Sequence, residues 1–348
     1  MPALSYLKIG DSPFEAGQAL GRFGAAAVHG HLLHTRAWRS VMQWRGSAAA
    51  ATMAALVRDR FPGIWSELEG LAAGLRLPLD EVFLWNCRGD LWAMAPDGCT
   101  TVQLPGDLCQ RISHNEDGDP GFAGHCAIAE CAIAGRPSFA SFVYPGSLPG
   151  HAFAATDAGL AMTVNNLRAL QVTPGVPRMV LTRAMLDAPT LNDALAVLRD
   201  APRAGGFHLT LGHCQSQRIL SVEFSSEACS VLDIETPSMH ANHAIHPAMR
   251  DLPQIITGSS RHRQSRGDAM LAQARTQGRA VDPLAILADA MDAEFPIYRN
   301  DPADSDDENT MATADILIHA THIDWQVYED RQEPARFRIS NGRVQSHP

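Results

Sequence analysis

The run Asp97-Gly98-Cys99-Thr100-Thr101 decides how this chain is interpreted. Cys99 carries a potentially nucleophilic thiol and directly follows Gly98. Because Gly98 has no side chain, its carbonyl is open to attack and its backbone tolerates strain. The character of the sequence also changes here, from helical spacing before Gly98 to short strand-like runs after it. The run therefore predicts a boundary between segments 1–98 and 99–348. Asn115-Glu116-Asp117 begins eighteen residues after Asp97, a second motif close to this boundary.

The segment before Gly98 is predicted to be mainly helical. Apolar residues recur at helical spacing, and Pro62 suits the first turn of a helix. Asp80 is predicted to cap a further helix. The expected helices cover residues 14–38, 62–77 and 80–94.

After Gly98 the sequence predicts strands of antiparallel hairpins, interrupted by helices. Thr190 is predicted to cap one of these helices, and the acidic loop 300–309 is expected to be solvated. This order favours an α+β fold with two sheets between helical layers. The expected strands are 100–104, 109–115, 127–133, 138–144, 151–156, 159–165, 206–211, 219–224, 230–234, 314–321 and 325–329. The expected helices are 176–187, 191–200, 259–277 and 282–293.

Composition excludes several classes of protein. The 348 residues carry a formal charge of −10, which argues against a nucleic-acid surface. No run approaches the roughly 20 apolar residues that span a bilayer, and the first residues do not resemble a signal peptide. The seven cysteines include no CxxC pair, which favours reduced thiols and a cytoplasmic protein. We expect the six cysteines other than Cys99 to be buried or inert.

Several motifs occur in an order that resembles one family. The similarity covers segments 10–17, 61–86, 97–101, 115–117, 164–166, 222–225, 240–243 and 296–299. Together they resemble the acyl-CoA:6-aminopenicillanic acid acyltransferase family, also called the isopenicillin N acyltransferase family, whose members are autoproteolytic Ntn-hydrolases. The resemblance implies a four-layer αββα Ntn-hydrolase sandwich with a mainly helical N-terminal pro-segment.

The resemblance also implies a chemistry. The chain would cut itself between Gly98 and Cys99, through an N-to-S acyl shift and hydrolysis of the thioester. Cys99 would then carry both the nucleophilic thiol and a free α-amine as its base. Residues 1–98 would stay bound to residues 99–348 as a partner chain, because the apolar stripe of helix 62–77 must be covered.

Three further catalytic roles are carried over from the family. The resemblance assigns Asp117 to hold the new α-amine, Asn242 to donate to the oxyanion, and Arg299 to balance charge near Asp117 and Cys99. Candidate pocket residues are Asn115, Glu116, Tyr144, Asn165, Asn166 and His243. No metal or cofactor is predicted, and a CoA thioester is retained as an alternative acyl donor.

The sequence departs from the penicillin-forming members near the nucleophile. Segment 114–118 reads His-Asn-Glu-Asp-Gly in place of a Gln-Asn-Trp-Asp-Phe type of run, and segment 144–150 also differs. These differences predict another pocket shape and favour hydrolysis of a small N-acyl amide: an acyl amino acid, an acyl amine or a β-alanyl amide. The alternative is CoA-dependent N-acyl transfer to a β-lactam-like or amine acceptor.

Other interpretations remain open at this point. A penicillin V or bile-salt type amidase would use similar residues, but the long segment before Cys99 counts against it. A family member that only binds ligands, without catalysis, is a second alternative. A metal protein using His240, His243 and His246, or the cluster 29–34, is a third, and Pro247 argues against the geometry of the first set. The sequence is compatible with homo-oligomerisation and with a small-molecule substrate.

Overall fold

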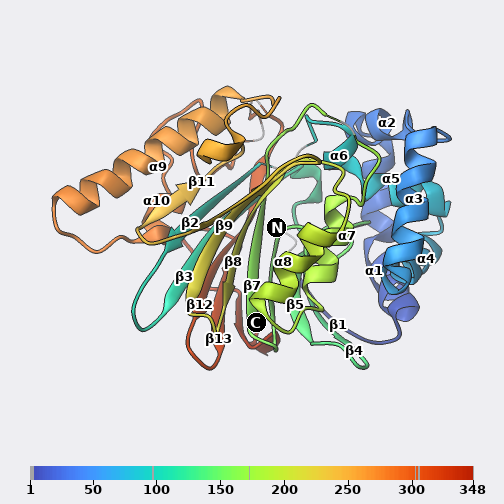
Figure 1. Cartoon of the computed structure of the whole chain (residues 1–348), viewed down its shortest axis with the longest axis horizontal. Helices are drawn as coiled ribbons and strands as arrows, with labels where there is room; N and C mark the ends of the chain where they lie inside the picture. Colours follow the sequence, from blue (N-terminus) through green and yellow to red (C-terminus); the bar gives the residue numbers. More distant parts are fainter. Residues whose placement is uncertain (1–3, 96–97, 172, 302, 305, 348) are drawn as a thin grey trace.

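A computed structural model describes residues 4–95, 98–171, 173–301, 303–304 and 306–347. Two β-sheets pack face to face, and helices cover their outer sides (Figure 1). The N-terminal helices lie at one side of the sheets, and α9 and α10 lie at the other (Figure 1). This architecture confirms the predicted α+β sandwich of the Ntn-hydrolase type.

The larger sheet has eight strands in the order β1-β4-β5-β6-β7-β8-β9-β10. Its neighbours pair in antiparallel fashion except β1, which pairs with β4 in parallel. The strands are β1 Ser5–Asp11, β4 Ala127–Ile133, β5 Phe139–Val143, β6 Phe153–Thr156, β7 Leu160–Asn166, β8 Phe207–His213, β9 Arg218–Phe224 and β10 Cys229–Asp233.

The second sheet has seven strands in the order β11-β2-β3-β12-β13-β14-β15, all antiparallel. The strands are β11 Ser238–His240, β2 Cys99–Leu104, β3 Gln110–Gly118, β12 Asn309–Ile318, β13 Ile323–Tyr328, β14 Phe337–Ser340 and β15 Arg343–Ser346. β2 therefore lies between β3 and the short strand β11, so Cys99 begins a strand with neighbours on both sides.

Helices form the outer layers. Helices α1 and α8 contact the eight-stranded sheet, whereas α9 and α10 contact β11, β2 and β3 of the other sheet. The helices are α1 Pro13–Gly30, α2 Arg36–Met42, α3 Ala48–Arg60, α4 Pro62–Leu75, α5 Leu79–Trp85, α6 Arg88–Leu91, α7 Arg178–Met185, α8 Leu191–Asp200, α9 Gly258–Thr276 and α10 Pro283–Leu287. Short 3₁₀ turns cover Leu32–His34, Pro120–Phe122 and Pro247–Met249.

Glycines set the close crossing of α1 and α4. A Cβ atom on Gly17 would lie 1.8 Å from the Glu67 carbonyl oxygen, and one on Gly70 would lie 1.9 Å from that of Phe14. Such contacts exclude any side chain at these positions. The start of α1 is fixed by a capping box, in which Ser12 and Glu15 satisfy each other's backbone N–H groups.

Several expected elements differ in the structure. The first segment also contributes a strand, β1, because its alternation pairs with a distant partner, β4. The expected helix 14–38 ends at Gly30 and resumes at Arg36. The expected helix 80–94 is split into α5 and α6, and Asp80 lies in the first turn of α5 after the N-cap Pro78.

The acidic loop 300–309 is not solvated throughout, contrary to expectation. Glu308 is 1% exposed, and the Asp304 side chain is 5% exposed. Both bind the buried guanidinium of Arg299, which offsets the cost of removing their charges from water. Residues 302 and 305 lie outside the described residues.

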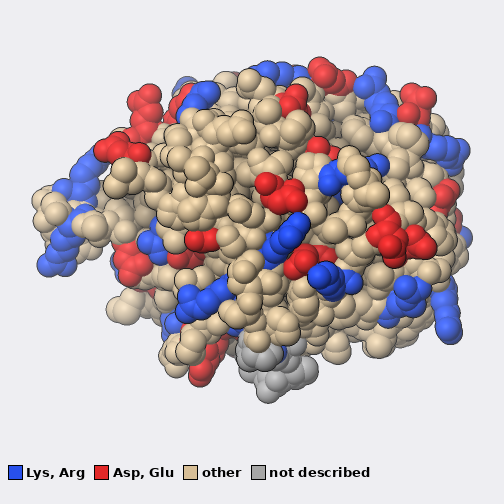
Figure 2. All heavy atoms as spheres, turned by 90° about the horizontal axis from the view of Figure 1, so that it is seen from below, with Lys and Arg blue, Asp and Glu red and all other residues tan. Residues whose placement is uncertain are grey.

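Acidic and basic side chains are interspersed over the face drawn in Figure 2. Within the described ranges, no helix combines the length and the apolarity needed to cross a bilayer.

Candidate active site

The hairpin of β2 and β3 positions Cys99, the predicted nucleophile. Cys99 pairs with Glu116, Thr101 pairs with His114, and Thr100 pairs with Asn115. Because directly opposed residues share a face of a sheet and neighbours alternate, two sets of side chains result. The inner set, Cys99, Thr101, His114 and Glu116, faces the eight-stranded sheet, since Thr101 contacts Thr163 and Asn165 of β7. The outer set, Thr100, Asn115 and Asp117, faces α9 and α10.

The peptide bond between Gly98 and Cys99 is held at both of its polar atoms. The backbone N–H of Asp117 donates to the Gly98 carbonyl oxygen at 2.8 Å. The Cys99 N–H donates to Asn242 Oδ1 at 2.9 Å. The hydrogen bond from Asp117 polarises the Gly98 carbonyl as an oxyanion-hole donor does. The hydrogen bond to Asn242 binds the Cys99 nitrogen, which would be the leaving group if this peptide bond were cut. Asp97 of the predicted motif lies outside the described residues.

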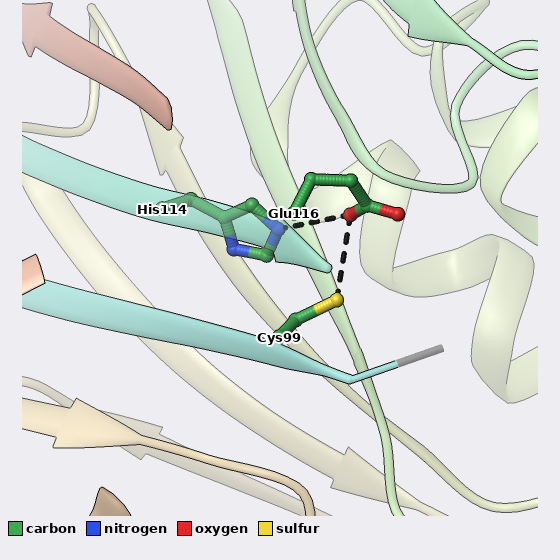
Figure 3. Close-up of side chains that lie close together, drawn as sticks. All are labelled: Cys99, His114 and Glu116. Atoms are coloured by element: carbon green, nitrogen blue, oxygen red, sulfur yellow. Dashed lines mark hydrogen bonds and ion pairs between the residues drawn. The ribbon is translucent and has the colours of Figure 1, made fainter. Parts of the chain in front are cut away.

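On the inner face the Cys99 thiol lies against a carboxylate. Its Sγ is 3.4 Å from Glu116 Oε2, and the same oxygen is 3.1 Å from His114 Nε2 (Figure 3). All three side chains are buried, and burial lowers the pKa of His114 to about 3. Their ligand atoms lie within 4.8 Å of one another, a spacing that also suits a metal ion.

Arg263 is a site residue that the sequence did not reveal. Its guanidinium donates to the Cys99 carbonyl oxygen at 2.7 Å, to Thr100 Oγ1 at 2.8 Å and to Asn242 Oδ1 at 2.7 Å. Burial lowers its pKa, although Asp117 opposes this shift. A sequence signal existed in the helical spacing of Ser260, Arg263 and Gly267, which form part of the buried face of α9.

Asp117 is fully buried on the outer face. Its Oδ1 accepts from Thr310 Oγ1 at 2.7 Å, and among the described residues its Oδ2 has no hydrogen-bond partner. Burial raises the pKa of this carboxyl to about 7, while Arg299 and Arg263 lower it. A side-chain contact with Cys99, as the family role implies, is not among the hydrogen bonds between described residues.

Arg299 and Glu308 lie beside Gly98. Arg299 Nη1 binds Glu308 Oε2 at 2.6 Å, and Arg168 Nη2 binds Glu308 Oε1 at 2.9 Å. A Cβ atom on Gly98 would lie 2.0 Å from Glu308 Oε2 and 3.0 Å from Arg299 Nη1. Arg168 also donates to the Ala95 carbonyl oxygen at 3.3 Å. Two buried cations and one carboxylate thus enclose the residues around the predicted cleavage point, and neighbouring acids raise the pKa of Arg299.

Two candidate pocket residues, Asn165 and Asn166, are hydrogen-bonded to Thr101 and Asn242 of the site. Asn166 accepts through its backbone oxygen from Asn242 Nδ2 at 3.1 Å. Asn165 accepts through Oδ1 from Thr101 at 2.8 Å and from His208 Nδ1 at 3.2 Å.

Three other candidate pocket residues bind partners outside the group formed by Cys99, His114 and Glu116. Asn115 faces outward and joins Leu287 of α10 to Thr313 of β12, so it is not brought to the thiol side of the sheet. Tyr144 packs on Phe122 and Phe142 near the end of β3. His243 binds Ser260 Oγ at 2.8 Å, and burial lowers its pKa to about 4.

The described histidines weighed as metal ligands contact protein groups, and His240 and His246 share Glu223. His240 binds Glu223 at 2.8 Å and stacks on His208, whereas His246 binds Ser221 and Ser230. In the N-terminal cluster, His29 contacts the Leu75 carbonyl oxygen and His31 contacts Asp119. The groupings with metal-like spacing among the described residues are instead Cys99 with His114 and Glu116, and His319 with His322 and Asp324.

A surface hollow of about 730 Å³ reaches the edge of this site. Its lining includes Arg299, which acts on Asp117 by charge, and Thr310, which donates a hydrogen bond to it. Phe122 and Tyr298 supply apolar surface in the same hollow. A small molecule with a polar and an apolar part fits such a lining.

The fold and the site define a class: an Ntn-hydrolase-like sandwich with a cysteine at the start of a strand. The chain belongs to the family described as acyl-coenzyme A:6-aminopenicillanic acid acyl-transferase, which matches residues 105–332. The matched range contains Asp117, Asn242 and Arg299, and it begins shortly after Cys99.

A similar protein is Beta-alanyl-dopamine/carcinine hydrolase of Drosophila melanogaster, with 29% identity over 165 residues. This similarity covers 42% of the present chain and 43% of that relative, so the chain spans less than half of the relative's length in the match.

Proposed function

We propose that this chain cuts itself between Gly98 and Cys99 and then acts as an N-terminal-cysteine amidohydrolase or acyltransferase. The observation that carries the proposal is the grip on this one peptide bond: Asp117 N–H on its carbonyl oxygen and Asn242 Oδ1 on its N–H. A nucleophilic thiol on the next side chain completes the requirements for an N-to-S acyl shift.

After the cut, the same groups would serve a second reaction. The Cys99 α-amine takes the thiol proton, and the thiolate attacks a substrate amide to give a thioester acyl-enzyme. The Asp117 N–H, released from Gly98, offers an oxyanion donor in a fixed place. Asn242 Nδ2 is the second predicted donor. The buried Asp117 carboxylate, with Arg299 and Arg263 facing it, provides a charge to hold the amine.

The first 98 residues are proposed to remain bound. Their strand β1 is part of the eight-stranded sheet, and Ile64, Leu68 and Leu71 are buried in the common core. Glu67 of α4 also makes a fully buried ion pair with Arg183 of α7 at 2.9 Å. Separating the two chains would expose this apolar surface and remove Arg183 from the Glu67 carboxylate, whereas Arg183 would keep its ion pair with Asp187.

The proposed substrate is a small N-acyl amide, with a β-alanyl amide first among the candidates. The name of the Drosophila relative supports this choice. The test is hydrolysis of β-alanyl-dopamine and carcinine by the cleaved protein, with N-propionyl-dopamine as a neutral analogue and Cys99→Ala as the control. Hydrolysis of the β-alanyl amides by wild type alone supports the proposal. Equal rates with the variant would reject the thiol mechanism.

A second candidate is acyl transfer, which the description of the family favours. The same acyl-enzyme would form from a CoA thioester and be resolved by an amine in place of water. Adding acyl-CoA with dopamine or 6-aminopenicillanic acid, and measuring release of free CoA and N-acylated product, separates transfer from hydrolysis.

A further inference from the structure

Self-cleavage poses a chemical problem that the mature mechanism does not solve. In the intact chain the nitrogen of Cys99 is part of a peptide bond, so the α-amine that serves as base does not yet exist. A thiol near its ordinary pKa is mostly protonated at neutral pH and attacks poorly. The first cut therefore needs another acceptor for the Sγ proton.

The inner face supplies a group in the right place. Glu116 Oε2 lies 3.4 Å from Cys99 Sγ, and the carboxyl group is 2% exposed (Figure 3). His114 Nε2 holds the same oxygen from the other side at 3.1 Å. Cys126 is another titratable neighbour of Glu116, and its burial, together with the nearby Glu116, raises the pKa of its thiol and keeps it neutral.

The hydrogen-bond chain behind His114 fixes its proton. Asn165 Nδ2 donates to the His240 carbonyl oxygen, so Asn165 Oδ1 is the atom that accepts from Thr101 at 2.8 Å. The single hydroxyl proton of Thr101 is thereby used, and His114 Nδ1, 2.8 Å from Thr101 Oγ1, must be the donor in that contact. A neutral His114 ring that carries its proton on Nδ1 can only accept at Nε2. The contact between Nε2 and Glu116 Oε2 therefore requires a proton between these two atoms.

We propose that Glu116 and His114 act together as the base for the first cut. This inference rests on the proposed self-cleavage. The pair holds one proton at rest and takes a second one from Cys99 Sγ, leaving a thiolate. The imidazole becomes charged as the thiolate forms beside the pair, so the buried site stays neutral overall.

The remaining steps balance. The thiolate forms a C–S bond to the Gly98 carbonyl carbon while the Asp117 N–H binds the oxygen. The C–N bond breaks, and the Cys99 nitrogen takes the proton back from the pair to become a free amine. Water then attacks the thioester, forming the Gly98 carboxyl group and restoring the thiol. From this point the α-amine replaces the pair as base.

The test follows the cut in full-length chains made by cell-free translation, with samples moved to buffers from pH 6.5 to 9 and read by intact mass. Glu116→Gln keeps the shape but accepts no proton. We expect its cleavage at pH 7 to be slower than that of wild type by at least about 100-fold, the usual contribution of general-base catalysis. The rate of the variant should rise about tenfold per pH unit as hydroxide replaces the lost base, whereas the wild-type rate should change less steeply.

Matched variants keep the test decisive. Glu130→Gln changes another largely buried carboxyl, bound to Tyr6 and Val344, and should cleave like wild type. Glu116→Asp retains a carboxyl group and should recover part of the rate. Equal rates for Glu116→Gln and wild type at pH 7 would overturn the inference, provided that circular dichroism shows the same fold.

Two further results separate this inference from the proposed function. If wild type is never cut, or if Cys99→Ala is cut, self-cleavage by the thiol itself fails. Glu116→Gln protein cut at pH 9 and returned to pH 7 should lose less of its amide hydrolysis than it lost of its cleavage rate, because the α-amine is then the base. A loss of turnover as large as the loss of cleavage would contradict a role confined to the first cut.

Discussion

The two faces of the β2–β3 hairpin serve different needs. The inner face carries the thiol with Glu116 and His114, three buried groups joined in one hydrogen-bond chain. The outer face carries Asp117 with Arg263 and Arg299, a concentration of buried charge without direct contact to the thiol. Residues one position apart in a strand thus reach separate environments. Under the proposed mechanism, activation of the thiol and placement of the predicted scissile peptide are therefore assigned to different faces of the hairpin.

The largest expected effect comes from Arg263→Met on the outer face. The change removes the bonds to the Cys99 carbonyl oxygen and to Asn242, and it leaves Asp117 with one facing cation fewer. We expect a loss of about 3 to 5 kcal/mol of stability, as for a broken buried ion pair, and a cleavage rate lower by about 100-fold or more. Arg266→Met, three residues on in α9, removes a half-exposed pair with Asp289 and should cost less than about 1 kcal/mol. Denaturant unfolding and intact mass measure both, and equal effects of the two variants would show that Arg263 has no special role.

Asp117→Asn tests the charge on the outer face through pH. The pKa of this carboxyl is about 7 in the fold and about 4 when unfolded, so the folded state binds more protons. The contribution of Asp117 to stability is therefore largest below about pH 4 and is lost as pH rises toward 7. In a Cys99→Ala background, raising pH from 5 to 8 should destabilise the chain with Asp117 by about 2 to 3 kcal/mol relative to the Asn variant. If the stability of the chain with Asp117 and that of the Asp117→Asn variant changed with pH in parallel, burial of the ionised carboxyl would cost no free energy of unfolding.

Gly98→Ala tests the close approach beside the proposed scissile bond. The added Cβ would meet Glu308 Oε2 at 2.0 Å, so this carboxylate must move and its bonds to Arg168 and Arg299 must weaken. The expected cost is about 1 to 3 kcal/mol, together with slower cleavage. Gly30→Ala, at the end of α1 with no atom within 4 Å of the new Cβ, should change neither quantity. Thermal unfolding in the Cys99→Ala background gives the cost in stability, and unaltered cleavage of Gly98→Ala would show that Glu308 adapts freely.

The smallest effect compares two adjacent threonines. Thr100→Val removes one outer-face bond to Arg263, and Thr101→Val removes the inner-face link between His114 and Asn165. Each should cost about 1 to 2 kcal/mol. Only Thr101→Val should slow cleavage at pH 7 strongly, by about tenfold, because it frees the proton of His114 from its fixed place. The reverse order of cleavage rates would contradict the division between the faces.

Local pattern was sufficient for much of this fold. Alternation and turn residues predicted most strands after Gly98, and Thr190 caps α8 as expected. The parallel pairing of β1 with β4 was not predictable, because it joins segments more than a hundred residues apart, with helices α1 to α6 and the β2–β3 hairpin between them in the chain. The short α10 in place of helix 282–293 reflects a chain that must turn back toward Asp289, whose carbonyl oxygen accepts from Ile297 and Tyr298.

The site was predictable to a similar degree. The motif around Cys99 and Asp117 placed both residues next to the same peptide bond. Arg263 escaped notice because α9 contains several arginines and only tertiary packing buries this one. Glu308 escaped because a run of acidic residues suggests a solvated loop, whereas Arg168 and Arg299 pair with it in the interior.

Self-cleavage between Gly98 and Cys99 is tested by intact-mass spectra of the purified chain under denaturing conditions, measured beside those of Cys99→Ala. Cleavage after Gly98 divides the 37.6 kDa chain into two fragments of unequal size. N-terminal sequencing of the larger fragment should read Cys99-Thr100-Thr101. We expect these two masses in wild type and one full-length mass in the variant. A single full-length mass in both, in fresh and aged samples alike, would contradict it.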